Sequence, residues 1–174
     1  MSKASVARLR EKHDGILGDL EDEMQRDAVR LWLRLLSCTM VIEKRIKRGL
    51  VEQFNTTLPR FDILAALDRA EDGLSMGALG RALLVSNGNI TGLVQTLARD
   101  GDVTMASAPG DRRTAIVSIT EEGRARFKTM ATAHHDWIAD MFQSLSADER
   151  DALMTQLDRL KRSIALAVNK EKTA

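Results

Sequence analysis

Apolar residues recur at helical spacing near both ends of the chain, and this pattern predicts long helices there. The first is expected over residues 27–54, with Leu31 and Leu35 among its apolar positions. Apolar side chains also fall on other sides of this helix, as at Met40 and Val41, so it needs cover on more than one face. Because one chain of 174 residues supplies too little cover, the pattern predicts dimerisation.

Shorter elements are predicted in the middle of the chain. Helices are expected over residues 60–70, 76–83 and 87–100, a short strand at Leu74, and paired strands over 103–106 and 114–119. Two further helices are expected over residues 121–144 and 147–169, and a short one near residues 5–13. Polar residues suited to N-caps precede most of these helices: Thr57, Ser75, Ser86, Thr120 and Ser146. Glycines suited to left-handed C-terminal ends follow two of them, Gly73 and Gly101.

These elements predict a mainly α fold with a small β-wing, which is a winged helix-turn-helix with N- and C-terminal dimerisation helices. The predicted segments are an N-terminal arm (1–26), a dimerisation helix (27–57), a winged lobe (58–120) and C-terminal dimerisation helices (121–174). Apolar content of 44% and charged content of 29% are typical of a globular protein. No apolar run reaches the roughly 20 residues that a bilayer requires, and the N-terminus lacks the apolar core of a signal peptide, so a cytoplasmic protein is expected.

The order of helix, turn, helix and strand pair predicts binding to double-stranded DNA. The leading part of a second helix enters the major groove, where Asn and Gln pair with adenine and Thr contacts a thymine methyl. An arginine at the tip of the strand pair can enter the minor groove. A net charge of +1 does not exclude this, since the clustering of charge matters more than its total. The predicted DNA-binding residues are Ser75, Ser86, Asn87, Gly88, Asn89, Thr91, Gln95, Asp111, Arg112 and Arg113.

Several short motifs in this region resemble the MarR family of winged-helix regulators. They include Val85-Ser86-Asn87, Thr91-Gly92-Leu93-Val94, Asp111-Arg112-Arg113 and Ser118-Ile119-Thr120-Glu121-Glu122-Gly123. The resemblance covers about residues 27–168 and implies a homodimer that binds a pseudo-palindromic operator, usually as a repressor. Family members usually carry an apolar residue where Asp102 stands, and often a Glu where Ala78 stands.

A narrower resemblance links residues 31–36 and 57–62 to regulators of aromatic acid breakdown. It implies a small effector, either an aromatic acid or its CoA thioester. An aromatic slot and cationic partners for such a ligand are predicted from Arg30, Trp32, Arg34, Leu36, Arg60 and Phe61. The alternative is that Trp32 is a core residue and the arginines are solvated.

No catalytic constellation is evident, so an enzyme is not expected, and neither a cofactor nor a metal is predicted. Adjacent His134 and His135 point about 100° apart on a helix, which does not suit shared metal ligation. The single cysteine, Cys38, excludes an internal disulfide and lacks the tyrosine partners of a peroxide sensor. Two other functions stay open: a winged-helix protein-interaction module, and an activator without small-molecule control.

Overall fold

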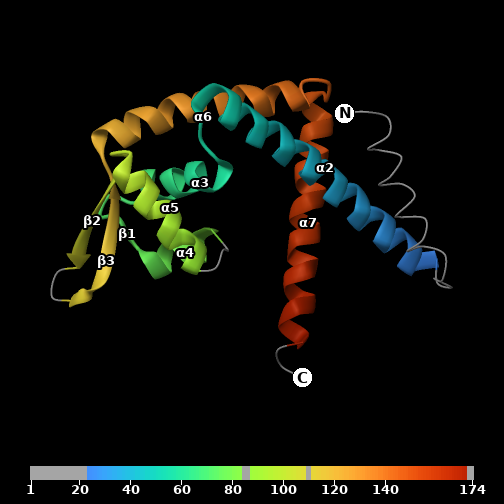
Figure 1. The fold of residues 1–174 in the computed structure, drawn as a ribbon. Helices are drawn as coiled ribbons and strands as arrows, with labels where there is room; N and C mark the ends of the chain where they lie inside the picture. Colours follow the sequence, from blue (N-terminus) through green and yellow to red (C-terminus); the bar gives the residue numbers. More distant parts are fainter. Residues whose placement is uncertain (1–22, 84–86, 109–110, 172–174) are drawn as a thin grey trace. The chain divides into compact units, whose positions relative to one another are not determined.

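The computed structural model describes residues 23–83, 87–108 and 111–171; for residues 87–89, 108, 111–113 and 170–171 only the backbone is described. The elements are α2 (Glu23–Phe54), α3 (Leu58–Asp68), β1 (Leu74–Ser75), α4 (Met76–Leu83), α5 (Asn87–Arg99), β2 (Val103–Ala108), β3 (Asp111–Ile119), α6 (Glu121–Phe142) and α7 (Ala147–Glu171). The predicted mainly α fold with a small β-wing is confirmed (Figure 1). The helix expected near residues 5–13 lies outside the described residues.

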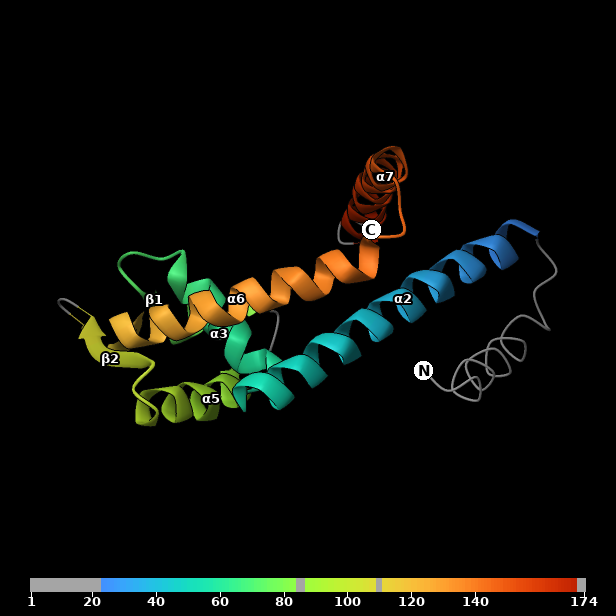
Figure 2. The same ribbon diagram turned by 90° about the horizontal axis from the view of Figure 1, so that it is seen from above.

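The chain divides into two compact units, residues 1–134 and 135–174, and the boundary falls within α6. In the first unit, α3, α4 and α5 contact one another and the sheet. The long helix α2 leads into α3 through a short connection (Figure 2). No helix among the described residues is both long and apolar enough to cross a membrane.

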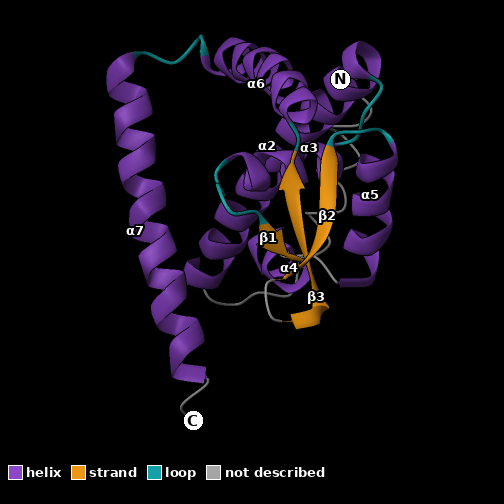
Figure 3. Ribbon diagram, turned by 90° about the vertical axis from the view of Figure 1, so that its left-hand side faces the viewer, coloured by secondary structure: helices purple, strands orange, loops and turns teal. Residues whose placement is uncertain are grey.

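The sheet has three antiparallel strands in the order β1-β3-β2, so β3 is central (Figure 3). Leu74 pairs with Val117 on one side of β3, and Met105 pairs with Val117 on the other. Both long strands extend further than the alternating pattern predicts, because Ala108 pairs with Asp111 past a register shift at Ser107 and Ala108. Arg112 and Arg113 therefore belong to β3 rather than to the connecting turn.

The core of the first unit lies where α3, α4 and α5 meet the sheet and α6. Its apolar side chains include Leu50, Ile63, Leu64, Leu67, Leu79, Ile90, Val94, Leu97, Val103, Val117 and Met130. In α2 only Leu33, Ile46, Gly49 and Leu50 are buried, and three of these four lie in its C-terminal half. Several large apolar side chains of α2, among them Met24, Leu31, Trp32 and Val51, are exposed.

Most predicted helix ends are confirmed, with one exception at α3. The Ser75 hydroxyl accepts a hydrogen bond from the Ala78 N–H at 3.2 Å, and both Gly73 and Gly101 adopt positive φ angles of 74° and 79°. Thr57, in contrast, makes no side-chain cap. The second helical residue, Pro59, has no N–H to donate, and the Thr57 side chain does not bond the N–H of the third, Arg60, either. Ser86 lies outside the described residues.

In the second unit, α7 begins with the predicted capping box. The Ser146 N–H donates to Glu149 Oε2 at 2.8 Å, and the Glu149 N–H donates to Ser146 Oγ at 3.3 Å. These bonds to the charged form hold the pKa of the Glu149 carboxyl below its usual value. Apolar side chains are exposed along α7: Leu153, Met154, Leu157, Ile164, Leu166 and Val168.

Candidate nucleic-acid interface

Helix α5 separates an apolar side from a polar side, as an exposed binding helix must. Ile90, Val94 and Leu97 are buried against the core, whereas Thr91 and Gln95 are exposed. Gly92 is also exposed, and a Cβ atom built there meets no group of the described residues within 4 Å. The helix therefore exposes Thr91, Gly92 and Gln95 on the side opposite its packing against the core. Asn87, Gly88 and Asn89 form the first turn of its backbone.

The C-terminal end of α5 is closed by a Schellman motif. The Asp102 N–H donates to the Leu97 carbonyl at 2.9 Å, and the Gly101 N–H donates to the Ala98 carbonyl at 3.2 Å. Gly101 supplies the left-handed residue that this motif requires, with a φ of 79°. The chain then enters β2 directly, so the end of the binding helix and the start of the wing are held together.

The start of α6 is hydrogen-bonded to the junction between α5 and β2, which is formed by Gly101 and Asp102. Thr120 Oγ1 accepts from the Gly123 N–H at 2.9 Å, which is the predicted N-cap, and donates to the Gly101 carbonyl at 2.7 Å. The Thr120 N–H donates to the Asp102 carbonyl at 3.0 Å. Gly123 packs so closely on Asp102 that a Cβ atom would overlap that carbonyl oxygen. The position of the binding helix is thus tied to α6.

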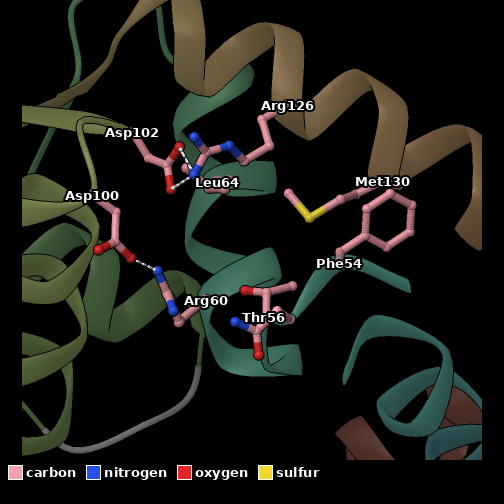
Figure 4. A pocket seen from close by; sticks show the side chains of 9 residues that line it. Phe54, Thr56, Arg60, Leu64, Asp100, Asp102, Arg126 and Met130 are labelled. Carbon is pink, nitrogen blue, oxygen red and sulfur yellow. Dashed lines mark hydrogen bonds and ion pairs between the residues drawn. The ribbon is translucent and has the colours of Figure 1, made fainter. Parts of the chain in front are cut away.

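Two ion pairs brace the junction, and both were missed by the reasoning from sequence (Figure 4). Arg60 of α3 pairs with Asp100, and Arg126 of α6 lies with Nη1 3.0 Å from Asp102 Oδ1. The Asp102 side chain is 3% exposed, and its burial raises the pKa of its carboxyl above the usual value, a shift that Arg126 and Arg60 oppose. One signal in the sequence could have indicated the pair of Asp102 with Arg126. Asp102 places a carboxylate at a position where the resemblance implies an apolar residue.

The wing follows as β2 and β3. Asp111, Arg112 and Arg113 are the first three residues of β3, and Asp111 pairs with Ala108, the last residue of β2. Behind the wing, Arg124 of α6 pairs with Asp68 at the end of α3 and also donates to the Asp68 carbonyl at 3.2 Å. The DNA-binding residues predicted from sequence that the structure describes thus lie on α5, at Ser75 of β1 directly before α4, and at the start of β3.

The predicted effector residues are not joined into one slot within a single chain. Trp32 and Leu36 are exposed on α2, with Trp32 about six helical turns before the C-terminal end of that helix. Phe61 is instead a core residue, 7% exposed, and its ring packs on Phe127 and His134 with centroids 5.4 and 5.2 Å away.

The arginines of the predicted effector set also fall in two places. Arg30 pairs with Asp27 at 3.3 Å and Arg34 donates to the Arg30 carbonyl, both exposed on α2, whereas Arg60 belongs to the junction at the end of α5. The alternative for Trp32, a core residue of its own chain, is wrong, because its side chain is 56% exposed.

The other residues singled out in the sequence take ordinary positions. Cys38 is exposed on α2. His134 stacks on Phe61 at an interplanar angle of 29°. Within the part of the chain that the structure describes, no three His, Cys, Asp or Glu side chains gather as a metal site.

Comparison with known proteins agrees with this geometry. A MarR family profile matches residues 54–114. BadR of Rhodopseudomonas palustris, a transcriptional activatory protein, is 37% identical over 106 residues, which cover 60% of this chain and only 60% of BadR. The crystal structure of a MarR family transcriptional regulator from Silicibacter pomeroyi superposes with a TM-score of 0.71 at 32% identity, covering 83% of this chain and 99% of that one.

CouR of Rhodococcus jostii, solved with bound p-coumaroyl-CoA, shares the fold at 20% identity. Its TM-score is 0.66, and the match covers 78% of this chain and 91% of CouR. The element order and the site together define a winged helix-turn-helix protein. The chain belongs to the MarR family, and the relatives it matches are transcriptional regulators rather than enzymes.

Proposed function

We propose that this chain is a homodimeric transcriptional repressor that binds a pseudo-palindromic DNA operator in the cytoplasm and is released by a small aromatic effector. The observation that supports DNA binding best is α5, which buries Ile90, Val94 and Leu97 while exposing Thr91, Gly92 and Gln95. Two such helices in successive major grooves need centres about 34 Å apart. A dimer provides that fixed spacing.

The uncovered apolar side chains of α2 and α7 support the homodimer. On α2, Met24, Leu31 and Trp32 are each at least half exposed, and on α7 Ile164 and Leu166 are as well. Large apolar side chains in such numbers are costly to leave in water, at roughly 25 cal/mol per Å². A second copy of the chain covers equivalent helices at once, which is how closed symmetric dimers form.

The exposed apolar face of α2 also supports an effector site. Trp32 and Leu36 provide this apolar surface, whereas Arg30 and Arg34 project from nearly the opposite side of the helix, about 160° away. These arginines are cations for a carboxylate or phosphate of a ligand that extends around α2. Arg60 and Phe61 lie away from this face, so in our proposal they line the site only if the dimer partner brings α2 against the winged lobe. CouR, with its bound p-coumaroyl-CoA, is the precedent for an aromatic thioester as ligand.

A direct test combines operator binding with release. Fluorescence anisotropy on DNA from beside the gene should show a site-specific complex that weakens steeply with salt, because binding phosphates releases counterions. p-Coumaroyl-CoA should release the DNA, whereas p-coumarate should not. Release by the free acid alone would remove the role of the thioester, and absence of any specific complex would favour a protein-interaction module.

BadR, an activatory protein, supports one second candidate, an activator. A reporter gene fused to the bound promoter distinguishes repression from activation. Reporter expression that rises when the gene is deleted fits our proposal, and expression that falls fits an activator.

Replacing Gly92 with alanine should stabilise the protein and yet weaken operator binding. The added methyl meets nothing in the free protein, and Ala is favoured over Gly in a helix by about 1 kcal/mol. If the backbone of α5 approaches DNA closely, the same methyl should lower affinity about ten-fold, equivalent to about 1.4 kcal/mol. Thermal unfolding and anisotropy measure both effects. Unchanged affinity would place Gly92 outside the interface.

A further inference from the structure

The start of α6 is attached to the α5–β2 junction at two separate places. At the first, the Thr120 N–H donates to the Asp102 carbonyl at 3.0 Å, and Gly123 packs on that carbonyl. At the second, Arg126 Nη1 lies 3.0 Å from Asp102 Oδ1 and 3.2 Å from Oδ2 (Figure 4). Arg126 stands about 9 Å along the helix from Thr120. One attachment leaves the direction of a helix free to turn, whereas two separated attachments fix it.

The stability of the fold does not by itself explain the pair of Asp102 with Arg126. The Asp102 side chain is buried and that of Arg126 is 54% exposed, and apolar residues can often replace such a pair without loss of stability. Phe127, whose ring packs on Phe61, and buried Met130 already hold α6 against the winged lobe. Apolar contacts have no preferred direction, so the ion pair is the contact that can set the angle of α6.

The base-reading end of α5 lies at the far end of the helix from this junction. Helix α5 has 13 residues and is therefore about 20 Å long, and its C-terminal end is closed by the Asp102 N–H on the Leu97 carbonyl. Turning α5 by about 10° at the junction would move its first turn by roughly 3.5 Å, about the rise of one base pair. A small change of angle at Asp102 is therefore sufficient to misplace the residues that face the bases.

We infer that Asp102 and Arg126 are positioning residues for operator binding, because their pair sets the angle between α5 and α6 without contacting DNA. The inference rests on the proposed function, in which α6 belongs to the helices that join two copies of the chain. Loss of the pair leaves the lobe folded but turns α5 from the direction that the operator requires. Binding to random-sequence DNA depends mainly on charge, so it does not need this angle.

Replacing Arg126 with methionine removes the cation and keeps a long side chain. Operator affinity should fall about ten-fold, whereas affinity for random-sequence DNA should stay within about two-fold of the parent. Fluorescence anisotropy measures both at a temperature where all variants are folded. Lys128→Met is the matched control, since it removes the same charge from an exposed position on the same helix, and it should leave operator affinity within about two-fold. Equal losses in the two variants would overturn the inference.

The double replacement of Asp102 with leucine and Arg126 with methionine separates position from stability. The melting temperature of Arg126→Met should fall, because the charge of Asp102 is left buried without its partner. In the double variant an apolar pair takes the place of the ion pair, so the melting temperature should return to that of the parent or exceed it. Operator affinity should nevertheless stay about ten-fold below that of the parent. A double variant that binds the operator as tightly as the parent would show a purely structural role.

A measurement on the free protein distinguishes this inference from the proposed function. Residual dipolar couplings of backbone amides in α5 and in residues 121–134 of α6 report the angle between the two helices in solution. The angle in the double variant should differ from that of the parent by about 10°, and Lys128→Met should not change it. An unchanged angle in the double variant overturns the inference whether or not an operator is found. A changed angle in a protein whose parent binds no operator supports the inferred pair and contradicts the proposed function alone.

Discussion

Replacing both Arg112 and Arg113 with alanine is expected to lower operator affinity by about 100-fold or more. The hairpin carries both residues at the start of β3, beside the turn that ends the wing. An arginine that enters a narrow minor groove or contacts phosphate contributes about 1–3 kcal/mol, and two such contacts multiply in the binding constant. Anisotropy titrations at several salt concentrations measure the loss, and the salt slope should fall by about two.

The control for this prediction removes equal charge elsewhere. Arg159 and Arg162 are exposed on α7, in the second compact unit, and their double replacement with alanine should change operator affinity little. Analytical ultracentrifugation should report the same dimer for the wing variant as for the parent. A wing variant that binds the operator as tightly as the parent would contradict the role of the wing. Equal losses in both variants would show that only overall charge matters.

Replacing Gly123 with alanine is expected to destabilise the protein by about 2 kcal/mol, even though alanine favours a helix. The new Cβ would overlap the carbonyl oxygen of Asp102, which is backbone and cannot rotate away. Overpacking of this kind costs about 1–3 kcal/mol. The displaced carbonyl also accepts the Thr120 N–H, so the strain reaches the start of α6. The melting temperature measured by thermal unfolding should fall by roughly 4–8 °C.

Gly92→Ala is the matched control for this change, since it adds the same methyl to a helix in open space. The two variants should shift the melting temperature in opposite directions. Gly123→Ala should also weaken operator binding, because Asp102 closes the C-terminal end of α5. If the Gly123→Ala variant melts at as high a temperature as the Gly92→Ala variant, α6 does not contact the α5–β2 junction as closely as described here.

Local signals determined most of the element boundaries in this chain. The N-cap of Thr120, the capping box of Ser146 and Glu149, and the left-handed Gly101 each act within a few residues, so their sequence context is sufficient. Thr57 shows the limit of this reasoning, because it directly precedes α3 as a cap residue should and yet its side chain makes no cap hydrogen bond.

Periodicity likewise predicted the buried face of α5, since Ile90, Val94 and Leu97 share one side of a helix at this spacing. Apolar spacing could not tell buried apolar residues from exposed ones. Phe61 and Trp32 are both aromatic residues on helices, yet Phe61 is buried in its own chain and Trp32 is exposed. Which of them is covered depends on elements far away in the sequence.

The sequence by itself thus determined a winged helix-turn-helix with long flanking helices, because helix periodicity, caps and turns are local properties. Only the tertiary structure brought Arg60 to Asp100 and Arg126 to Asp102, across 40 and 24 residues of chain. It also formed a cavity of about 390 Å³ beside these two pairs. Contacts of that length depend on how three helices and a sheet pack together, and no local pattern in the sequence specifies them.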